Sequence, residues 1–184
     1  MSGPPAELVF QEFPTFVYTH APTCHDCSRV DSPSGAHVAA GTTPPTFDVS
    51  KALDGGIVAS EAFRLVCSDV PGIEFEPLAG LEGHWLVEVS VRVRIDPFES
   101  RVHMGPTCST CGRPRYVTRS GAIRLLEDEL LPSGFSGTDV LFGDTADFGS
   151  TRPIRLRPHI LVDRSTARLL KSTSLLGIHL ITQP

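Results

Sequence analysis

The sequence predicts a single α+β domain over residues 1–184, built mainly on antiparallel sheet with two short strand–helix–strand units. Three observations lead to this fold class. One segment alternates apolar and other side chains over thirteen positions, and two remote segments share a strand–helix–strand pattern. The third is composition, with 40% hydrophobic and 20% charged residues, which is typical of a globular domain.

The N-terminal part begins with extended segments. Leu8–Phe10 predicts a short strand, and Phe16–His20 predicts a better one that leads into the first pair of cysteines. Residues 28–46 are rich in Ser, Gly, Pro and Thr and predict a long loop.

The first strand–helix–strand unit occupies residues 57–78. We expect a strand at Ile57–Ala59, an N-cap at Ser60 and a helix over Glu61–Ser68. Phe63 and Val66 would face inward from this helix.

The unit closes with a turn and a second strand. Pro71–Gly72 would end the helix, and a strand would resume at Ile73–Phe75. Residues 160–183 repeat this layout with few identical positions. Either an internal duplication or a chance likeness of two such units explains the similarity.

The clearest strand runs from His84 to Asp96. Its apolar positions are Trp85, Val87, Val89, Val91, Val93 and Ile95. This period of two predicts one buried and one solvated face on an antiparallel sheet. Residues 79–83 supply a turn that would pair this strand with residues 73–77.

The remaining elements are less regular. Strands are expected at Arg115–Thr118, Thr138–Phe142 and Ile154–Leu156, with a polar loop over Gly143–Thr151. Ala122–Leu131 fits one face of a helix and fits a strand nearly as well.

Two Cys-x-x-Cys pairs hold four of the five cysteines. They are Cys24, Cys27, Cys108 and Cys111. A Cys-x-x-Cys turn points both thiolates at one spot, so two such turns supply a tetrahedral set of four sulfurs for Zn²⁺. Gly112 suits the positive φ that often follows such a turn, whereas Ser28 predicts a less ideal first turn.

The pairs are separated by 80 residues, from Ser28 to Thr107. A structural zinc would therefore clasp two remote parts of the chain. A site without metal and a pair of redox-active dithiols are the alternatives. His20, His25 and His103 flank the cysteines, either as substitute ligands and hydrogen-bond donors to the site or, more simply, as exposed loop residues.

The N-terminus lacks a positive region followed by an apolar core, so we expect no signal peptide and a cytoplasmic location. A reducing compartment favours metal over disulfides. Apolar runs are short and interrupted by charge, so no membrane span is expected. The fifth cysteine, Cys67, lies in the helical pattern and would be a small buried hydrophobic residue.

The net charge is −5, which argues against a broad phosphate-binding surface. Acids gather in residues 121–150, and they are our candidates for a partner-binding surface. They are Glu127, Asp128, Glu129, Asp139, Asp144 and Asp147. Six bases follow in residues 151–184, namely Arg152, Arg155, Arg157, Arg164, Arg168 and Lys171. Such asymmetry is usually a solvated face and less often a partner surface.

No catalytic constellation or phosphate-binding fingerprint stands out, and we expect no enzymatic activity. The acids at 127–129 point in different directions along the chain and lack the pattern of a calcium loop.

The chain resembles a bacterial family named for its double CxxCG motif, whose members are associated with contact-dependent toxin systems as immunity proteins. The resemblance rests on Cys24–Cys27, Cys108–Arg113, Thr138–Phe142, Ile160–Arg164, Leu169–Leu170 and Gly177–Leu180. The chain departs from the family at Ser28, where the family prefers Gly, and in the longer Gly143–Pro158 stretch.

The resemblance implies a non-enzymatic protein that binds and neutralises a cognate toxin. The acidic segment would then face a basic cleft of that toxin, because complementary charge speeds and orients association. The alternative is a zinc-containing nucleic-acid-binding module that uses the C-terminal bases. Acidic net charge and sparse aromatic residues disfavour it. A redox-sensing dithiol protein is a third possibility.

Overall fold

The computed structural model describes residues 5–13, 24–28, 37–53, 55–143 and 156–183. The helices are α1 (Glu61–Cys67) and α2 (Arg164–Ser172). The strands are β1 (Ala6–Phe13), β2 (Val49–Ala52), β3 (Ile57–Ser60), β4 (Ile73–Pro77), β5 (His84–Val89), β6 (Arg92–Val93), β7 (Val102–Met104), β8 (Val117–Arg119), β9 (Phe135–Phe142), β10 (Arg157–Val162) and β11 (Ile178–Thr182).

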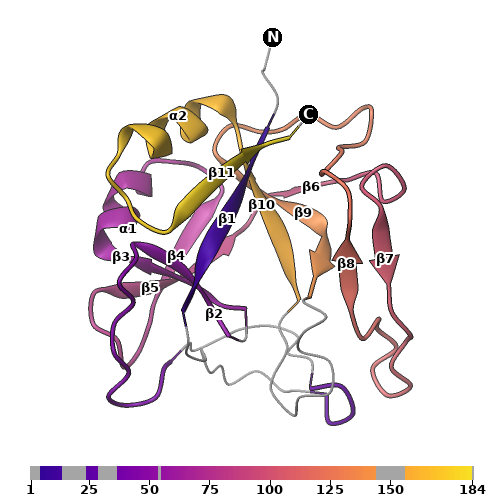
Figure 1. The fold of residues 1–184 in the computed structure, drawn as a ribbon, viewed down its shortest axis with the longest axis horizontal. Helices are drawn as coiled ribbons and strands as arrows, with labels where there is room; N and C mark the ends of the chain where they lie inside the picture. The colour runs from indigo at the N-terminus through magenta and orange to yellow at the C-terminus, as the bar shows by residue number, and fades with distance from the viewer. Residues whose placement is uncertain (1–4, 14–23, 29–36, 54, 144–155, 184) are drawn as a thin grey trace.

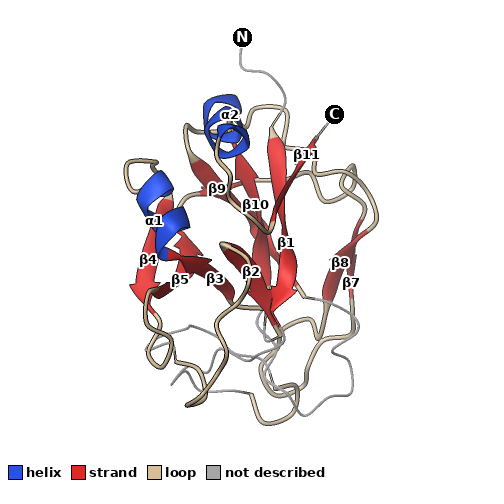
Figure 2. Cartoon of the chain, turned by 60° about the vertical axis from the view of Figure 1, so that its left-hand side comes forward, coloured by secondary structure: helices blue, strands red, loops and turns tan. Residues whose placement is uncertain are grey.

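Nine of these strands form one curled sheet in the order β4-β5-β3-β2-β1-β10-β9-β6, with β11 also paired to β1. The pairs β1–β2 and β6–β9 are parallel and the others are antiparallel. The α+β class with mostly antiparallel sheet is therefore confirmed, although the sheet is mixed. The separate hairpin β7–β8 lies on the side of the sheet away from both helices (Figures 1 and 2).

Strand β1 lies at the centre of the sheet because it has three partners. Its first residues pair with β10 on one edge and β11 on the other, and its last three pair with β2. Ala6 and Leu8 point into the main core under the helices, so Glu7 between them points to the opposite face. The central strand therefore carries the charged side chain of Glu7 toward the β7–β8 side.

Both helices begin with a side-chain N-cap, of which the one at Ser60 was predicted. The Ser60 hydroxyl accepts a hydrogen bond from the Phe63 N–H at 3.3 Å, and the Asp163 carboxylate accepts from Ser165 and Thr166. Phe63 is buried in the core as predicted, and Val66 packs against it while partly buried.

The two strand–helix–strand units have the same topology. In β3–α1–β4 the two strands flank β5, and in β10–α2–β11 they flank β1, with the middle strand antiparallel to both neighbours. Each is thus a split βαβ unit. An origin by duplication stays a prediction.

The expected continuous strand from His84 to Asp96 is wrong. It breaks at Ser90–Val91, where β5 ends and the chain moves to the far end of the sheet to form β6. The Ser90 N–H bonds to the Gly72 carbonyl in register with the β4–β5 pairs, whereas the Val91 carbonyl accepts from Gly137 on β9, so the chain changes partner strand between these two residues.

The alternation persists across the break because two different cores receive the apolar side chains. Val89 packs in the main core, whereas Val93 and Ile95 pack in a second cluster with Ile123 and Leu161. The expected solvated face is also wrong for β5, since Leu86 is fully buried in a third cluster behind the sheet. The predicted pairing of residues 73–77 with this strand is confirmed.

Other expected elements have mixed outcomes. Leu8–Phe10 and Thr138–Phe142 lie within β1 and β9, and the end of Arg115–Thr118 lies in β8. Ala122–Leu131 is not a helix, and its one strand contact is an isolated bridge between Leu125 and Ile95.

The expected strand at Phe16–His20 and most of Gly143–Thr151 lie outside the described residues, as do the first two residues of Ile154–Leu156. Residues 37–46 form no helix and contribute one isolated bridge, as expected for the described part of the long loop. Among the described residues, no helix is long and apolar enough to cross a membrane.

Candidate functional site

The second Cys-x-x-Cys pair lies in the turn that joins β7 to β8. A bridge between Thr107 and Pro114, together with the hydrogen bond from the Cys108 N–H to the Arg113 carbonyl at 2.8 Å, narrows the hairpin to a tight turn. The Gly112 N–H then bonds to the Cys108 carbonyl at 2.9 Å. This closure directs both thiols of the pair to the same side.

The first pair adopts the same turn despite its different closing residue. The Ser28 N–H bonds to the Cys24 carbonyl at 2.8 Å, matching the bond of Gly112 to Cys108. Ser28 has φ 55° and Gly112 has φ 69°, so both occupy the left-handed region. For Ser this conformation costs about 1–2 kcal/mol, which makes the first turn the strained one, as the sequence suggested.

The two turns bring all four thiols into one cluster, which we call the four-cysteine cluster (Cys24, Cys27, Cys108 and Cys111). All four sulfurs lie within 4.8 Å of one another. The Sγ–Sγ distance is 3.9 Å for Cys24 and Cys108 and 3.7 Å for Cys27 and Cys111. These distances exceed a disulfide bond of about 2.05 Å, and all four cysteines are free thiols.

The spacing suits a metal ion at the centre of the cluster. Four sulfurs at about 2.3 Å from a tetrahedrally coordinated zinc lie about 3.8 Å apart, which is close to both of these Sγ–Sγ distances. Cys108 is fully buried, and the other three thiols are half-buried. The cluster could therefore hold a metal ion.

Local hydrogen bonds favour the thiolate that a metal requires. The backbone N–H groups of Cys111 and Thr110 point at the Cys108 sulfur and lower its pKa to about 6, against the opposing effect of desolvation. Metal binding therefore displaces a weakly held proton at this ligand.

The surroundings add a contact between the two turns. The Thr110 hydroxyl donates to the Asp26 carboxylate, and His25 lies 3.0 Å from the same carboxylate while 80% exposed. His103 is exposed and bonds to Ser120. Neither His25 nor His103 belongs to the cluster, and His20 lies outside the described residues.

Cys67 is separate from this site. It ends α1 inside the main core with no exposed surface, and burial raises the pKa of its thiol to about 12. It is a buried small hydrophobic residue, as predicted.

The predicted partner-binding acids are only partly brought together. Arg94 lies 3.1 Å from Asp128 and 2.8 Å from Glu129, and Glu129 keeps only 16% of its side-chain surface exposed. Asp139 is exposed and accepts a hydrogen bond from the Ile95 N–H at 3.1 Å. Glu127 is exposed, whereas Asp144 and Asp147 lie outside the described residues.

The C-terminal bases do not form one surface among the described residues. Arg164, Arg168 and Lys171 are exposed on α2, whereas Arg157 lines a cavity beside β8. Arg152 and Arg155 lie outside the described residues.

A buried ionic network centred on Glu7 was not predicted. Both carboxylate oxygens lie 2.5 Å from Nη2 of Arg119, and one lies 2.6 Å from Nδ1 of His159. The Gln183 side-chain amide donates to the other oxygen at 2.9 Å. The Glu7 side chain is only 3% exposed. Burial raises its pKa, but the hydrogen bonds and positive charge of His159 and Arg119 outweigh this effect and hold the pKa below its ordinary value.

The only sequence signal for this network is a lone acid within the apolar run from Ala6 to Phe10. A charged residue in the middle of a central strand must be paired when it is buried. Its partners come from three remote elements, so sequence spacing gives no indication of them.

The sequence matches no known protein-family model and no curated protein.

Replacement of Ser28 by Gly should stabilise the protein, by up to about 1 kcal/mol, because Gly adopts positive φ without the steric cost of a side chain. The counterpart Gly112→Ala should destabilise it by about the same amount. A methyl group added at Gly112 meets no atom within 4 Å, so the change in stability reflects the cost of the positive φ alone. Urea unfolding midpoints of both variants measure these effects. Equal midpoints in all three proteins would contradict the strain at Ser28.

Replacement of Glu7 by Gln should destabilise the protein at pH 7 by roughly 3–5 kcal/mol, because Arg119, whose side chain is only 17% exposed, loses its charged partner. The pKa of Glu7 is lower in the folded protein than in the unfolded chain, so its contribution is complete above about pH 4.3. The contribution declines as pH falls from there through the folded pKa.

The free energy of unfolding of wild type should therefore fall toward that of Glu7→Gln as the solution is acidified below pH 4.3. Urea unfolding at several pH values measures the difference. Glu82→Gln, at an exposed turn, is the matched control and should lie within about 0.5 kcal/mol of wild type at pH 7. A constant gap between wild type and Glu7→Gln across this range would contradict the lowered pKa.

Proposed function

We propose that the four-cysteine cluster holds one structural zinc ion and that the protein is a non-enzymatic immunity protein that binds and neutralises a cognate toxin. The four-cysteine cluster is the observation that carries this proposal. It joins, in one site, the two cysteine motifs among the segments on which the resemblance to the double-CxxCG family rests.

Zinc is the metal that the ligand set favours. Thiolates are soft ligands, and a tetrahedral set of four sulfurs is typical of structural zinc and of iron–sulfur proteins. The turn that closes each pair, with its N–H bonded to the first cysteine carbonyl, holds two sulfurs for one ion. Four protein ligands leave no open coordination position for a substrate, so this zinc would stabilise the fold.

The protein should bind one zinc ion per chain, and Cys108→Ser should lose it and lower the melting temperature by several degrees, because structural zinc contributes directly to folding. Native mass spectrometry and thermal unfolding, on protein purified without chelator, measure both. Cys67→Ala is the matched control and should keep its zinc. Wild type without metal, or an unchanged melting temperature in Cys108→Ser, would contradict a structural zinc.

The toxin-binding surface follows from the exposure of the acidic side chains. Arg94 neutralises Glu129 and part of Asp128, which leaves, among the described candidate acids, Glu127, the 76% exposed Asp128 and Asp139 as exposed negative groups. Leu130 beside them is 82% exposed. An exposed apolar side chain bordered by charge is an arrangement found at protein interfaces.

Charge reversal of Glu127 and Asp128 to Lys should slow association with the toxin several-fold at low salt. The effect should fade at physiological ionic strength, where exposed charges are screened beyond about 8 Å. The toxin is first identified by pull-down from the native cytosol and mass spectrometry, and stopped-flow or surface-plasmon measurements then give the association rate. Glu82→Lys, on the β4–β5 turn at the opposite end of the sheet, is the matched control.

Assays of DNA and RNA binding distinguish the immunity proposal from the nucleic-acid-binding alternative. Binding of DNA or RNA that persists at physiological salt and is lost on neutralising Arg164 and Arg168 would contradict the immunity proposal. Failure to capture any toxic protein would contradict it as well.

A further inference from the structure

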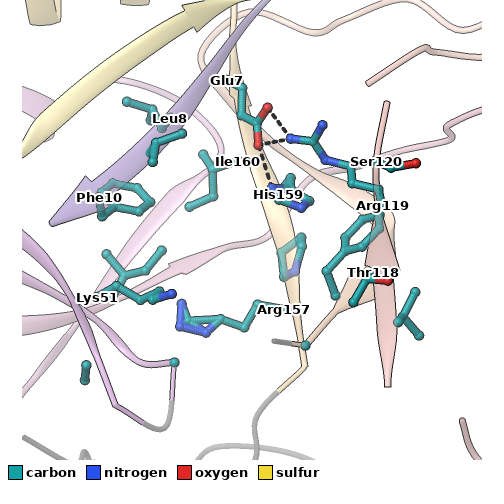
Figure 3. A pocket seen from close by; sticks show the side chains of 18 of the residues that line it. Glu7, Leu8, Phe10, Lys51, Thr118, Arg119, Ser120, Arg157, His159 and Ile160 are labelled. Carbon is teal, nitrogen blue, oxygen red and sulfur yellow. Dashed lines mark hydrogen bonds and ion pairs between the residues drawn. The ribbon is translucent and has the colours of Figure 1, made fainter. Parts of the chain in front are cut away.

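A cavity of about 590 Å³ lies between the centre of the sheet and the β7–β8 hairpin (Figure 3). Its walls come from β1, β2, β8 and β10 and from the end of β9. This volume lies within the range of small-molecule sites, about 300–1,000 Å³. The four-cysteine cluster and the proposed toxin-binding acids are not part of its lining.

The lining combines a basic group with an apolar one. The basic residues are Lys51, Arg119, Arg157 and His159, and the apolar residues include Phe10, Leu53, Ile57, Val117, Phe142 and Ile160. Among the described lining residues, Glu7 is the one carboxylate. A cavity with an apolar body and a few convergent polar groups is the usual form of a ligand site.

Glu7 does not neutralise the whole cavity. Its two oxygens already contact Arg119, His159 and Gln183, at the end of the cavity that is uppermost in Figure 3. Its negative charge therefore balances positive charge at that end only. Among the described residues no carboxylate pairs with Lys51, which is half-buried at the lower end.

Two cations converge at that lower end. Figure 3 shows the Lys51 and Arg157 side chains extending toward each other from β2 and β10. An anion between these two side chains gains charge-assisted hydrogen bonds from both. The guanidinium of Arg157 is suited to a planar or tetrahedral oxyanion and the ammonium of Lys51 to a point charge.

We propose that this cavity binds a small amphipathic anion, whose carboxylate or phosphate group lies between Lys51 and Arg157 and whose apolar body extends along the apolar lining. Phe10 and Phe142 lie on the strands that border this path. The inference rests on the cavity alone and goes beyond the proposed immunity function.

Isothermal titration calorimetry with four probes tests the proposal. Octanoate and octyl phosphate carry both parts of the ligand, octanol lacks the charge, and inorganic phosphate lacks the apolar body. At least one of the two amphipathic anions should bind saturably with one site per chain, at least tenfold more tightly than octanol and than phosphate. The preferred anion identifies the head group as carboxylate or phosphate.

Variants at Lys51 locate the site. Lys51→Gln should weaken binding of the preferred anion about tenfold, and Lys51→Arg, which keeps the charge, should stay within about threefold of wild type. Lys171→Gln on the exposed face of α2 is the matched control and should bind as wild type does. Thermal unfolding of each variant verifies that it is folded.

Amide chemical shifts measured during titration should change in β2 and β10 and stay constant at the four-cysteine cluster. Three outcomes would overturn the proposal: no saturable binding of either anion, octanol bound as tightly as the anions, or Lys51→Gln bound as tightly as wild type.

Discussion

The pairing of β1 with three strands is the constraint on which the rest of the structure depends. This strand joins the β2–β3–β5–β4 half of the sheet to the β10–β9–β6 half, and it also receives the last strand of the chain. Its central position forces Glu7 into the interior, because Ala6 and Leu8 fill the core on the other face. A buried carboxylate is tolerated only where positive charge and hydrogen bonds replace water, and His159 from β10 and Arg119 from β8 supply both.

The same ion pair explains how the β7–β8 hairpin is held. Arg119 ties the base of the hairpin to the central strand, and its second Nη donates to the Gly121 carbonyl. At the other end, the turn of the hairpin meets the Cys24–Cys27 turn in the four-cysteine cluster, 84 residues away in sequence. The hairpin is thus attached at both ends and stands beside the sheet, and the cavity lies between them. Ladder pairing alone would not fix this arrangement, since β7 and β8 pair only with each other among the described strands, although the Gly143 N–H after β9 donates to the Val117 carbonyl of β8.

The features that could be predicted from sequence are those with local chemistry. The Cys-x-x-Cys spacing itself determines where two thiols point, and the cap at Ser60 places the start of α1 at Glu61. The break between β5 and β6 was not predictable, because an alternating pattern has the same period whether its apolar side enters one core or two. The Glu7 network could not be predicted from the sequence for a related reason. Its partners lie 112 and 176 residues away for Arg119 and Gln183, and only the strand order brings them together.

The arrangement separates three kinds of chemistry within one fold. The thiols lie at the tip of the hairpin, the converging cations lie in the cavity at its side, and the exposed acids lie near β6 at the edge of the sheet. Arg94 pairs with Asp128 and Glu129, two of the acids that the sequence groups into one negative segment. The negative surface is therefore smaller than the net charge of −5 suggests. A protein partner on that edge and a small anion in the cavity would therefore make contact with different strands. Occupancy of the cavity would act on the partner only by shifting the β7–β8 hairpin or the curled sheet, because coupling between sites requires an element that both can move.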